Sequence, residues 1–115
     1  MTITRQNAGP RMSQAVVHNG TVYLAGQVSA EPPASTKGQT EQVLKKIDAA
    51  LAAAGTSKSN LLSATIYLSN IANFDEMNAA WDAWVQPGNT PARATVETRL
   101  ANTKCLVEIS VIAAI

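Results

Sequence analysis

Residues 91–115 read PARATVETRLANTKCLVEISVIAAI, and their character alternates with a period of two, which predicts two β-strands joined by a short connection. One face of the first strand carries mainly small and apolar residues. The opposite face is polar and carries Arg93, Thr95, Glu97 and Arg99. The second strand is apolar on nearly every position of both faces, and Glu108 interrupts it.

Glu108 needs an explanation, because a carboxylate among apolar neighbours is costly to desolvate without a partner. An antiparallel hairpin with residues 101–104 as its loop would put Arg93, Thr95 and Glu97 on the face of Glu108. Two interpretations stay open: a solvated face with a salt bridge, which alternation alone favours, or an anion-binding site. In this register Arg93 and Glu108 stand roughly 13 Å apart along the strand, so they share a site only obliquely or across a subunit boundary.

The composition indicates one globular domain, spanning residues 1–115, with 46% hydrophobic residues and a net charge of +1. Lysines and arginines are scattered, so we expect neither nucleic acid nor a membrane as partner. A single cysteine and a start without an apolar segment favour the cytoplasm. With His18 the only histidine and Cys105 the only cysteine, we expect no metal site.

The first half of the chain contains a hairpin signal, since Asn19-Gly20 separates two apolar runs, 15–18 and 21–25. We expect His18 at an exposed strand end rather than in catalysis. Gly26 follows the second run, where a glycine either ends the strand or brings backbone N–H groups close to a ligand. The segment from there to residue 38, with its two prolines, predicts a loop.

Two helical segments follow, at about 36–54 and 74–85, with a strand at 62–68 between them. Gly55 suits the end of the first helix. Asn73 and Glu76 suit the start of the second, as in a capping box. Asn78 is the polar exception on an otherwise apolar stripe; pinning nearby backbone is favoured over ligand contact. The rest of that stripe predicts core packing, and its members are Phe74, Met77, Trp81, Trp84 and Val85.

The order of strands and helices predicts an α+β fold, in which one mixed sheet carries both helices on a single face. The strands are apolar on both sides and no third helix remains. We therefore expect another subunit to cover the second sheet face.

Four segments together resemble the RidA/YjgF family, and most closely its YoaB-like branch. They are GPRMSQAVVHNGTVYLAGQV (9–28), NFDEMNAAWDAW (73–84), PARATVE (91–97) and VEISVIA (107–113). The resemblance implies a chorismate-mutase-like fold and a homotrimer whose sheets form a central barrel, with clefts between subunits. It also implies hydrolysis of enamines and imines of the 2-aminoacrylate type to 2-keto acids and ammonia, without a metal or organic cofactor.

The resemblance further assigns roles to residues. Arg93 matches the arginine that holds the substrate carboxylate, and Glu108 the glutamate associated with the catalytic water. Gly26 would supply a backbone N–H, and Asn78 matches the asparagine of the second helix. The expected pocket is completed by Thr95, Arg11, Met12 and Trp84.

Departures from the family pattern leave the substrate open. Arg11 and Met12 stand where the family often has a tyrosine, Ala25 replaces a serine, and Thr95 replaces a frequent cysteine. Arg11 either adds positive charge for a more anionic ligand or is an ordinary exposed arginine. A non-catalytic trimeric module that binds a small carboxylate therefore stays open beside the deaminase, and a purely structural role has the least support.

Overall fold

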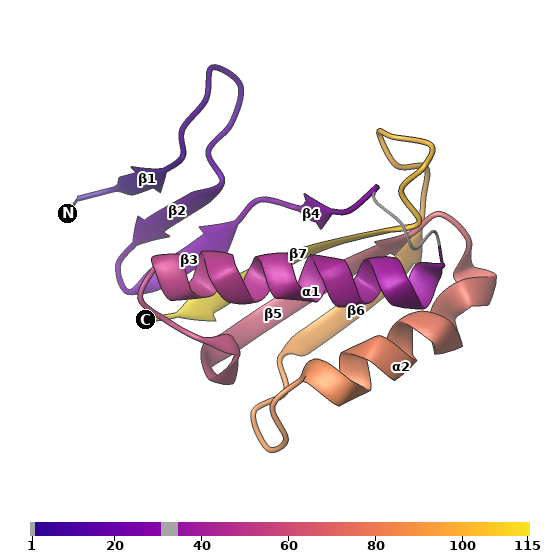
Figure 1. Cartoon of the computed structure of the whole chain (residues 1–115). Helices are drawn as coiled ribbons and strands as arrows, with labels where there is room; N and C mark the ends of the chain where they lie inside the picture. Colours follow the sequence, from indigo (N-terminus) through magenta and orange to yellow (C-terminus); the bar gives the residue numbers. More distant parts are fainter. Residues whose placement is uncertain (1, 31–34) are drawn as a thin grey trace.

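The computed structural model describes residues 2–30 and 35–115. The middle of the predicted loop before the first helix, with Pro32 and Pro33, lies outside the described residues. The strands are β1 (Thr4–Gln6), β2 (Ala15–His18), β3 (Thr21–Leu24), β4 (Gln27–Val28), β5 (Leu61–Leu68), β6 (Ala92–Glu97) and β7 (Val107–Ala114). The helices are α1 (Thr36–Ala53) and α2 (Phe74–Trp84), with 3₁₀ turns η1 (Lys58–Asn60) and η2 (Ile71–Asn73) (Figure 1).

The β2–β3 hairpin confirms the Asn-Gly prediction. Asn19 and Gly20 have φ of 53° and 73°, the paired positive values that a tight two-residue turn requires. His18 ends β2 but is half-buried rather than fully exposed, and its Nε2 lies 3.1 Å from Nδ2 of Asn19. The short strands β1 and β4 were not anticipated from the sequence, which placed them in a lead-in and a loop.

The sheet is mixed, with strand order β1-β2-β3-β7-β5-β6 and β4 paired beside β7. Only the β5–β6 pair is parallel among the described strands. The predicted hairpin of the last two strands is therefore wrong, because β5 lies between them. Helix α2 connects β5 to β6, and a helical crossover is the connection that parallel neighbours need.

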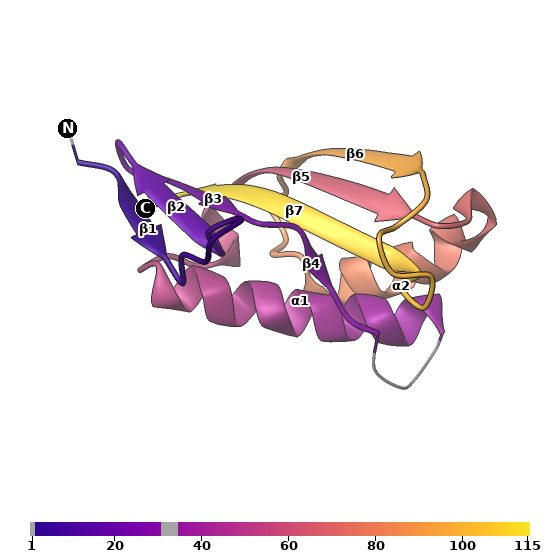
Figure 2. The same ribbon diagram turned by 90° about the horizontal axis from the view of Figure 1, so that it is seen from above.

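Both helices cover the same face of the sheet, as predicted (Figure 2). Ser35 caps the N-terminus of helix α1, because its hydroxyl accepts a hydrogen bond from the N–H of Gly38. The helix ends before Gly55, whose φ is 88°. The capping box expected for α2 is absent, since the Asn73 side chain makes no capping bond. Glu76 instead accepts from the backbone N–H of Lys37, so it caps α1 across the helix pair.

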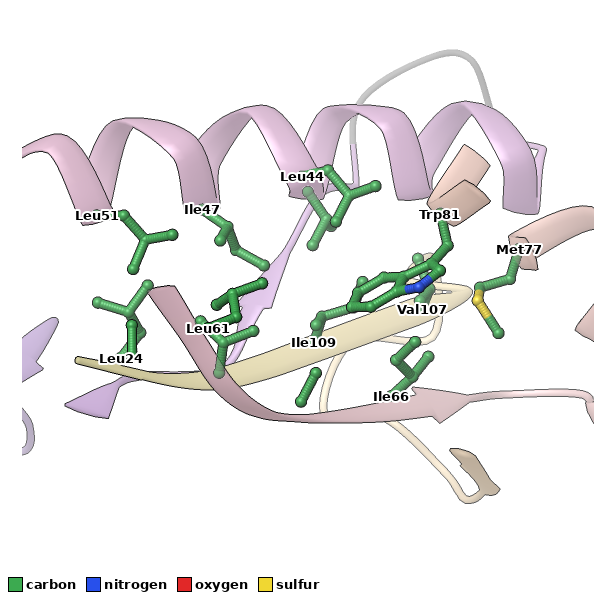
Figure 3. Close-up of a cluster of buried hydrophobic side chains, with 14 of the residues drawn as sticks. Leu24, Leu44, Ile47, Leu51, Leu61, Ile66, Met77, Trp81, Val107 and Ile109 are labelled. Carbon is green, nitrogen blue, oxygen red and sulfur yellow. The ribbon is translucent and has the colours of Figure 1, made fainter. Parts of the chain in front are cut away.

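The core lies between the helices and the sheet (Figure 3). Its largest members come from α1, α2, β5 and β7, and each fully buried aliphatic side chain contributes roughly 1.5–3 kcal/mol. They include Leu44, Ile47, Leu51, Ile66, Met77, Trp81, Val107 and Ile109. Alternate residues of β7 are buried, so one face of this strand points toward the helices and the other toward the uncovered side of the sheet.

The other sheet face has no helix over it (Figure 2). Its side chains include large apolar groups, with Tyr23 46% exposed and Val96 43% exposed. Such a surface is unusual on a monomer and agrees with the expectation of a covering subunit. None of the described helices is both long and apolar enough to cross a membrane.

Candidate functional site

Arg93 lies on β6, where side chains of α2 fix its guanidinium. One terminal nitrogen donates a hydrogen bond of 2.8 Å to Oδ1 of Asn78. The guanidinium carbon lies 5.3 Å from the ring centre of Trp81 and 5.8 Å from that of Phe74. Cation–π contact with two rings orients the group while leaving other N–H donors to bind an anion. Asn78 thus holds a side chain, whereas the sequence favoured a backbone partner.

Thr95 lies two residues along β6 from Arg93, so both side chains leave the same face of the strand. Its Oγ1 is buried and has no hydrogen-bond partner within the described residues. A buried hydroxyl without a partner is costly, which makes this atom a candidate donor or acceptor for a bound molecule. We call Phe74, Asn78, Trp81, Arg93 and Thr95 the arginine cluster.

Glu108 lies on β7 beside Gly26, which immediately precedes β4. A Cβ atom placed on Gly26 would overlap the Glu108 carboxylate and lie 3.0 Å from its Cδ. Only glycine leaves room for the carboxylate at this point, because real Cβ atoms keep a greater distance. We call Gly26 and Glu108 the glutamate cluster.

The two clusters project from opposite faces of the sheet. Arg93 pairs with Ala64, which pairs with Val111, and both partners are buried under the helices. Glu108 pairs instead with Tyr67, which lies three residues after Ala64 on β5 and therefore faces the other side of the sheet. Directly paired residues share a face, so the prediction that Arg93 and Glu108 share one is wrong. The cause is the intervening β5, which changes the register assumed for a hairpin.

Other predicted pocket residues lie elsewhere in the single chain. Arg11 and Met12 are exposed on the β1–β2 loop, at the edge of the sheet opposite to β6 (Figure 1). Trp84 lies between α1 and α2, where its Nε1 donates to the Asp48 carboxylate. The chain brings Arg93 together with Thr95 and Asn78, and Glu108 together with Gly26, but it does not join these groups.

Sequence reasoning missed two members of the arginine cluster. Trp81 belongs to the core as predicted but also contacts the guanidinium, whereas Phe74, which was assigned to the core, is 38% exposed and contacts it too. Their spacing around Asn78 on α2 was the available signal, because i, i+4 and i+7 share a helix face. Within residues 2–30 and 35–115, no three His, Cys, Asp or Glu residues gather as metal ligands would.

Comparisons with known proteins place this geometry in a family. The model of the family described as "Endoribonuclease L-PSP" matches residues 2–115. A RutC family protein of Haemophilus ducreyi is 49% identical over 98% of this chain and 97% of its own length. The RutC family protein YoaB of Escherichia coli is 45% identical over the whole of both chains.

A solved structure and a relative that is named as an enzyme are also similar to this chain. The crystal structure of NMB1025, a YjgF family member from Neisseria meningitidis, has a TM-score of 0.96 at 45% identity and covers 99% of this chain and 95% of its own. A rat protein named 2-iminobutanoate/2-iminopropanoate deaminase is 32% identical, covering 88% of this chain and 77% of its own. All these similarities extend over most of the chain.

Proposed function

Because this chain belongs to the RidA/YjgF family, whose model is described as endoribonuclease L-PSP, we propose that it hydrolyses reactive 2-imino acids and their enamine tautomers to 2-keto acids and ammonia. The name of the rat relative supports this reaction class. The observation that carries the proposal is the orientation of Arg93 by Asn78, Trp81 and Phe74.

Arg93 acts as the clamp for the substrate carboxylate. A planar guanidinium grips a carboxylate through two charge-assisted hydrogen bonds, and its contacts on α2 fix it before the substrate arrives. Thr95 stands beside it with an unused hydroxyl, which supplies a further hydrogen bond to the substrate. Together they hold the imine carbon in one orientation.

Glu108 acts on the attacking water. The water adds to C2 of the imine with formation of a C–O bond, and Glu108 takes the proton that the water loses. The imine nitrogen takes that proton as the C=N double bond opens, which gives a tetrahedral carbinolamine. Its hydroxyl proton is then transferred through Glu108 to the nitrogen while the C=O bond forms and the C–N bond breaks, so ammonia leaves with both protons of the water and the keto acid remains. The backbone N–H of Gly26 offsets charge at the tetrahedral centre. The reaction needs neither a metal nor an organic cofactor.

The complete site forms between copies of the chain. One copy presents its arginine cluster and its glutamate cluster on opposite sheet faces, and the uncovered face includes exposed apolar side chains such as Tyr23 and Val96. In a homotrimer with the sheets around a central barrel, the arginine cluster of one copy meets the glutamate cluster of the next. The Arg11–Met12 loop of a neighbouring copy then completes the pocket.

Cleavage of RNA, which the family description names, is not what we propose for this chain. A net charge of +1 with scattered basic residues offers no stripe to follow a phosphate backbone. The only histidine, His18, is held between Asn19 and the backbone carbonyl of Thr2.

The test compares wild-type protein with Arg93→Ala in keto-acid release from enzymatically generated 2-aminoacrylate and 2-iminobutanoate. Loss of the clamp should lower kcat/KM by on the order of a hundredfold or more. Arg99→Ala, which removes an exposed arginine beyond β6, is the matched control and should keep wild-type activity.

If the wild-type protein accelerates no imine, the deaminase proposal fails. Calorimetry with 2-oxobutanoate then examines the second candidate, a non-catalytic carboxylate-binding module, which the same pre-oriented Arg93 supports. Binding lost only in Arg93→Ala would establish that module, whereas no binding in either protein would leave a structural role.

A further inference from the structure

A groove lies between α1 and α2, and neither Arg93 nor Glu108 lines it. It is an open hollow of about 310 Å³ whose apolar lining comes from Leu44, Ala80, Ala83 and Trp84. That volume is near the lower end of ligand pockets, so the occupant is a small molecule. Both helices lie on the opposite side of the sheet from its uncovered face, so a subunit over that face leaves the helix side accessible (Figure 2).

At one end of the groove, contacts within the protein hold the Trp84 ring in place. The indole Nε1 of Trp84 donates to both carboxylate oxygens of Asp48, at 3.1 and 3.0 Å. The ammonium of Lys58 donates to the backbone oxygen of Trp84 at 2.7 Å and lies 5.3 Å from the ring centre. These contacts fix the ring as a wall and direct the carboxylate of Asp48 and the ammonium of Lys58 toward Trp84.

The other end carries one negative and one positive side chain, Glu41 and Lys45, that contact no partner group within the described residues. Glu41 and Lys45 line the groove one helical turn apart on α1, and both are exposed. Neither side chain has a hydrogen-bond or ion-pair partner within the described parts of the chain. They flank the apolar lining formed by Leu44 and its neighbours.

This pattern matches an α-amino acid. Its ammonium and carboxylate are bonded to the same carbon and carry opposite charges, while its side chain can be wholly apolar. Glu41 is complementary to the ammonium, Lys45 to the carboxylate, and the Leu44–Ala80–Ala83–Trp84 lining to the side chain. A simple amine or carboxylic acid satisfies only one of the two charges.

We propose that the groove is a second ligand site, for α-amino acids with apolar side chains. The proposal does not rest on the imine chemistry. It does connect to Arg93, since the rings of Trp84 and Trp81 are 5.4 Å apart and Trp81 packs against the guanidinium. An occupant of the groove therefore touches the ring next to the one that orients Arg93.

The experiment uses tryptophan fluorescence, because the chain has only two tryptophans and one forms the groove wall. L-Leucine is titrated alongside 3-methylbutylamine, which lacks the carboxylate, and 4-methylpentanoate, which lacks the ammonium. We expect a saturable change with leucine and binding about tenfold weaker or worse with each analogue, since each loses one charge-assisted contact.

Variants locate the site. Glu41→Gln, Lys45→Gln and the groove-filling Ala83→Leu should each weaken leucine binding about tenfold. The matched controls are Asp82→Asn, Lys37→Gln and Ala79→Leu, which change exposed positions of the same helices outside the groove, and they should bind leucine as the wild type does.

Arg93→Ala separates this site from the Arg93 site, because leucine also carries a carboxylate. We expect binding to persist in Arg93→Ala. Binding abolished there but retained in Lys45→Gln would place leucine at Arg93 and overturn the proposal. The absence of a saturable signal in the wild-type protein would also overturn it, whatever the outcome of the imine assay.

Discussion

At the scale of single residues, the sequence identified the residues that break a pattern but not their partners. Glu108 stood out because it interrupts an apolar strand, and Asn78 because it interrupts an apolar helix stripe. The structure gives Asn78 a charged partner, Arg93, and places Glu108 against Gly26. Neither contact follows from periodicity, because both join distant segments whose approach depends on the assembled sheet.

Gly26→Ala should remove activity with little loss of stability. The new Cβ meets the flexible Glu108 side chain, which can rotate away at small cost, but the carboxylate then leaves its position. A displacement of about 1 Å can cost about a hundredfold in rate. We expect a loss of that order in kcat/KM for imine hydrolysis and a melting temperature close to wild type.

Gly9→Ala is the matched control, since a Cβ there would make an ordinary contact of 3.5 Å with the backbone oxygen of Met12. Its activity and melting temperature should both stay at the wild-type level. Wild-type turnover in Gly26→Ala would show that the position of Glu108 at this contact is unimportant for the reaction.

At the scale of elements, alternation predicted which residues share a face of each strand but not which strands are neighbours. The hairpin at residues 91–115 failed because proximity in sequence was taken for pairing. The helix between β5 and β6 was the better guide, since a β-α-β unit makes its strands parallel. The β2–β3 hairpin succeeded because Asn19-Gly20 specifies a turn directly.

The segment between β6 and β7 is held by a buried side chain of α1. Gln39 is 1% exposed; its Nε2 donates to the carbonyl of Lys104 and its Oε1 accepts from the N–H of Leu106. These two bonds satisfy the backbone where the chain enters β7, the strand that carries Glu108. Helix α1 therefore sets the start of the central strand.

Gln39→Met should destabilise the protein by roughly 1–3 kcal/mol, because the part-buried carbonyl of Lys104 and N–H of Leu106 both lose their partner. Urea unfolding measures the change, with every protein at the same concentration because association shifts apparent stability. Gln14→Met, at an exposed position, is the control and should change stability by less than about 0.5 kcal/mol. Equal stability of the two variants would contradict the role given to Gln39.

At the scale of the whole molecule, the two clusters lie on opposite faces of the sheet, and one of these faces has no helix over it. The sequence correctly predicted both helices on a single face. The second face is less apolar than expected, because β5 and β7 place Ser63, Thr65, Glu108 and Ser110 on it. The sequence left open a site shared across a subunit boundary, but it did not predict that Arg93 and Glu108 lie on opposite faces, which depends on β5 separating β6 from β7. Under the proposed function, a neighbouring copy brings its Glu108 to Arg93, since one copy holds these two residues on opposite faces of its sheet.

Mixing two inactive variants tests this division. In a trimer that contains both Arg93→Ala and Glu108→Gln chains, one cleft combines an intact Arg93 with an intact Glu108 from the next copy. Random assembly at equal amounts then restores about a quarter of the wild-type sites, from two proteins that are each inactive alone. The measurement is keto-acid release after the variants are unfolded together and refolded. Refolding each variant separately before mixing is the control and should restore nothing. If co-refolding also restored nothing although mixed trimers had formed, Arg93 and Glu108 would not act in one shared cleft, and the site would have to be sought within a single copy.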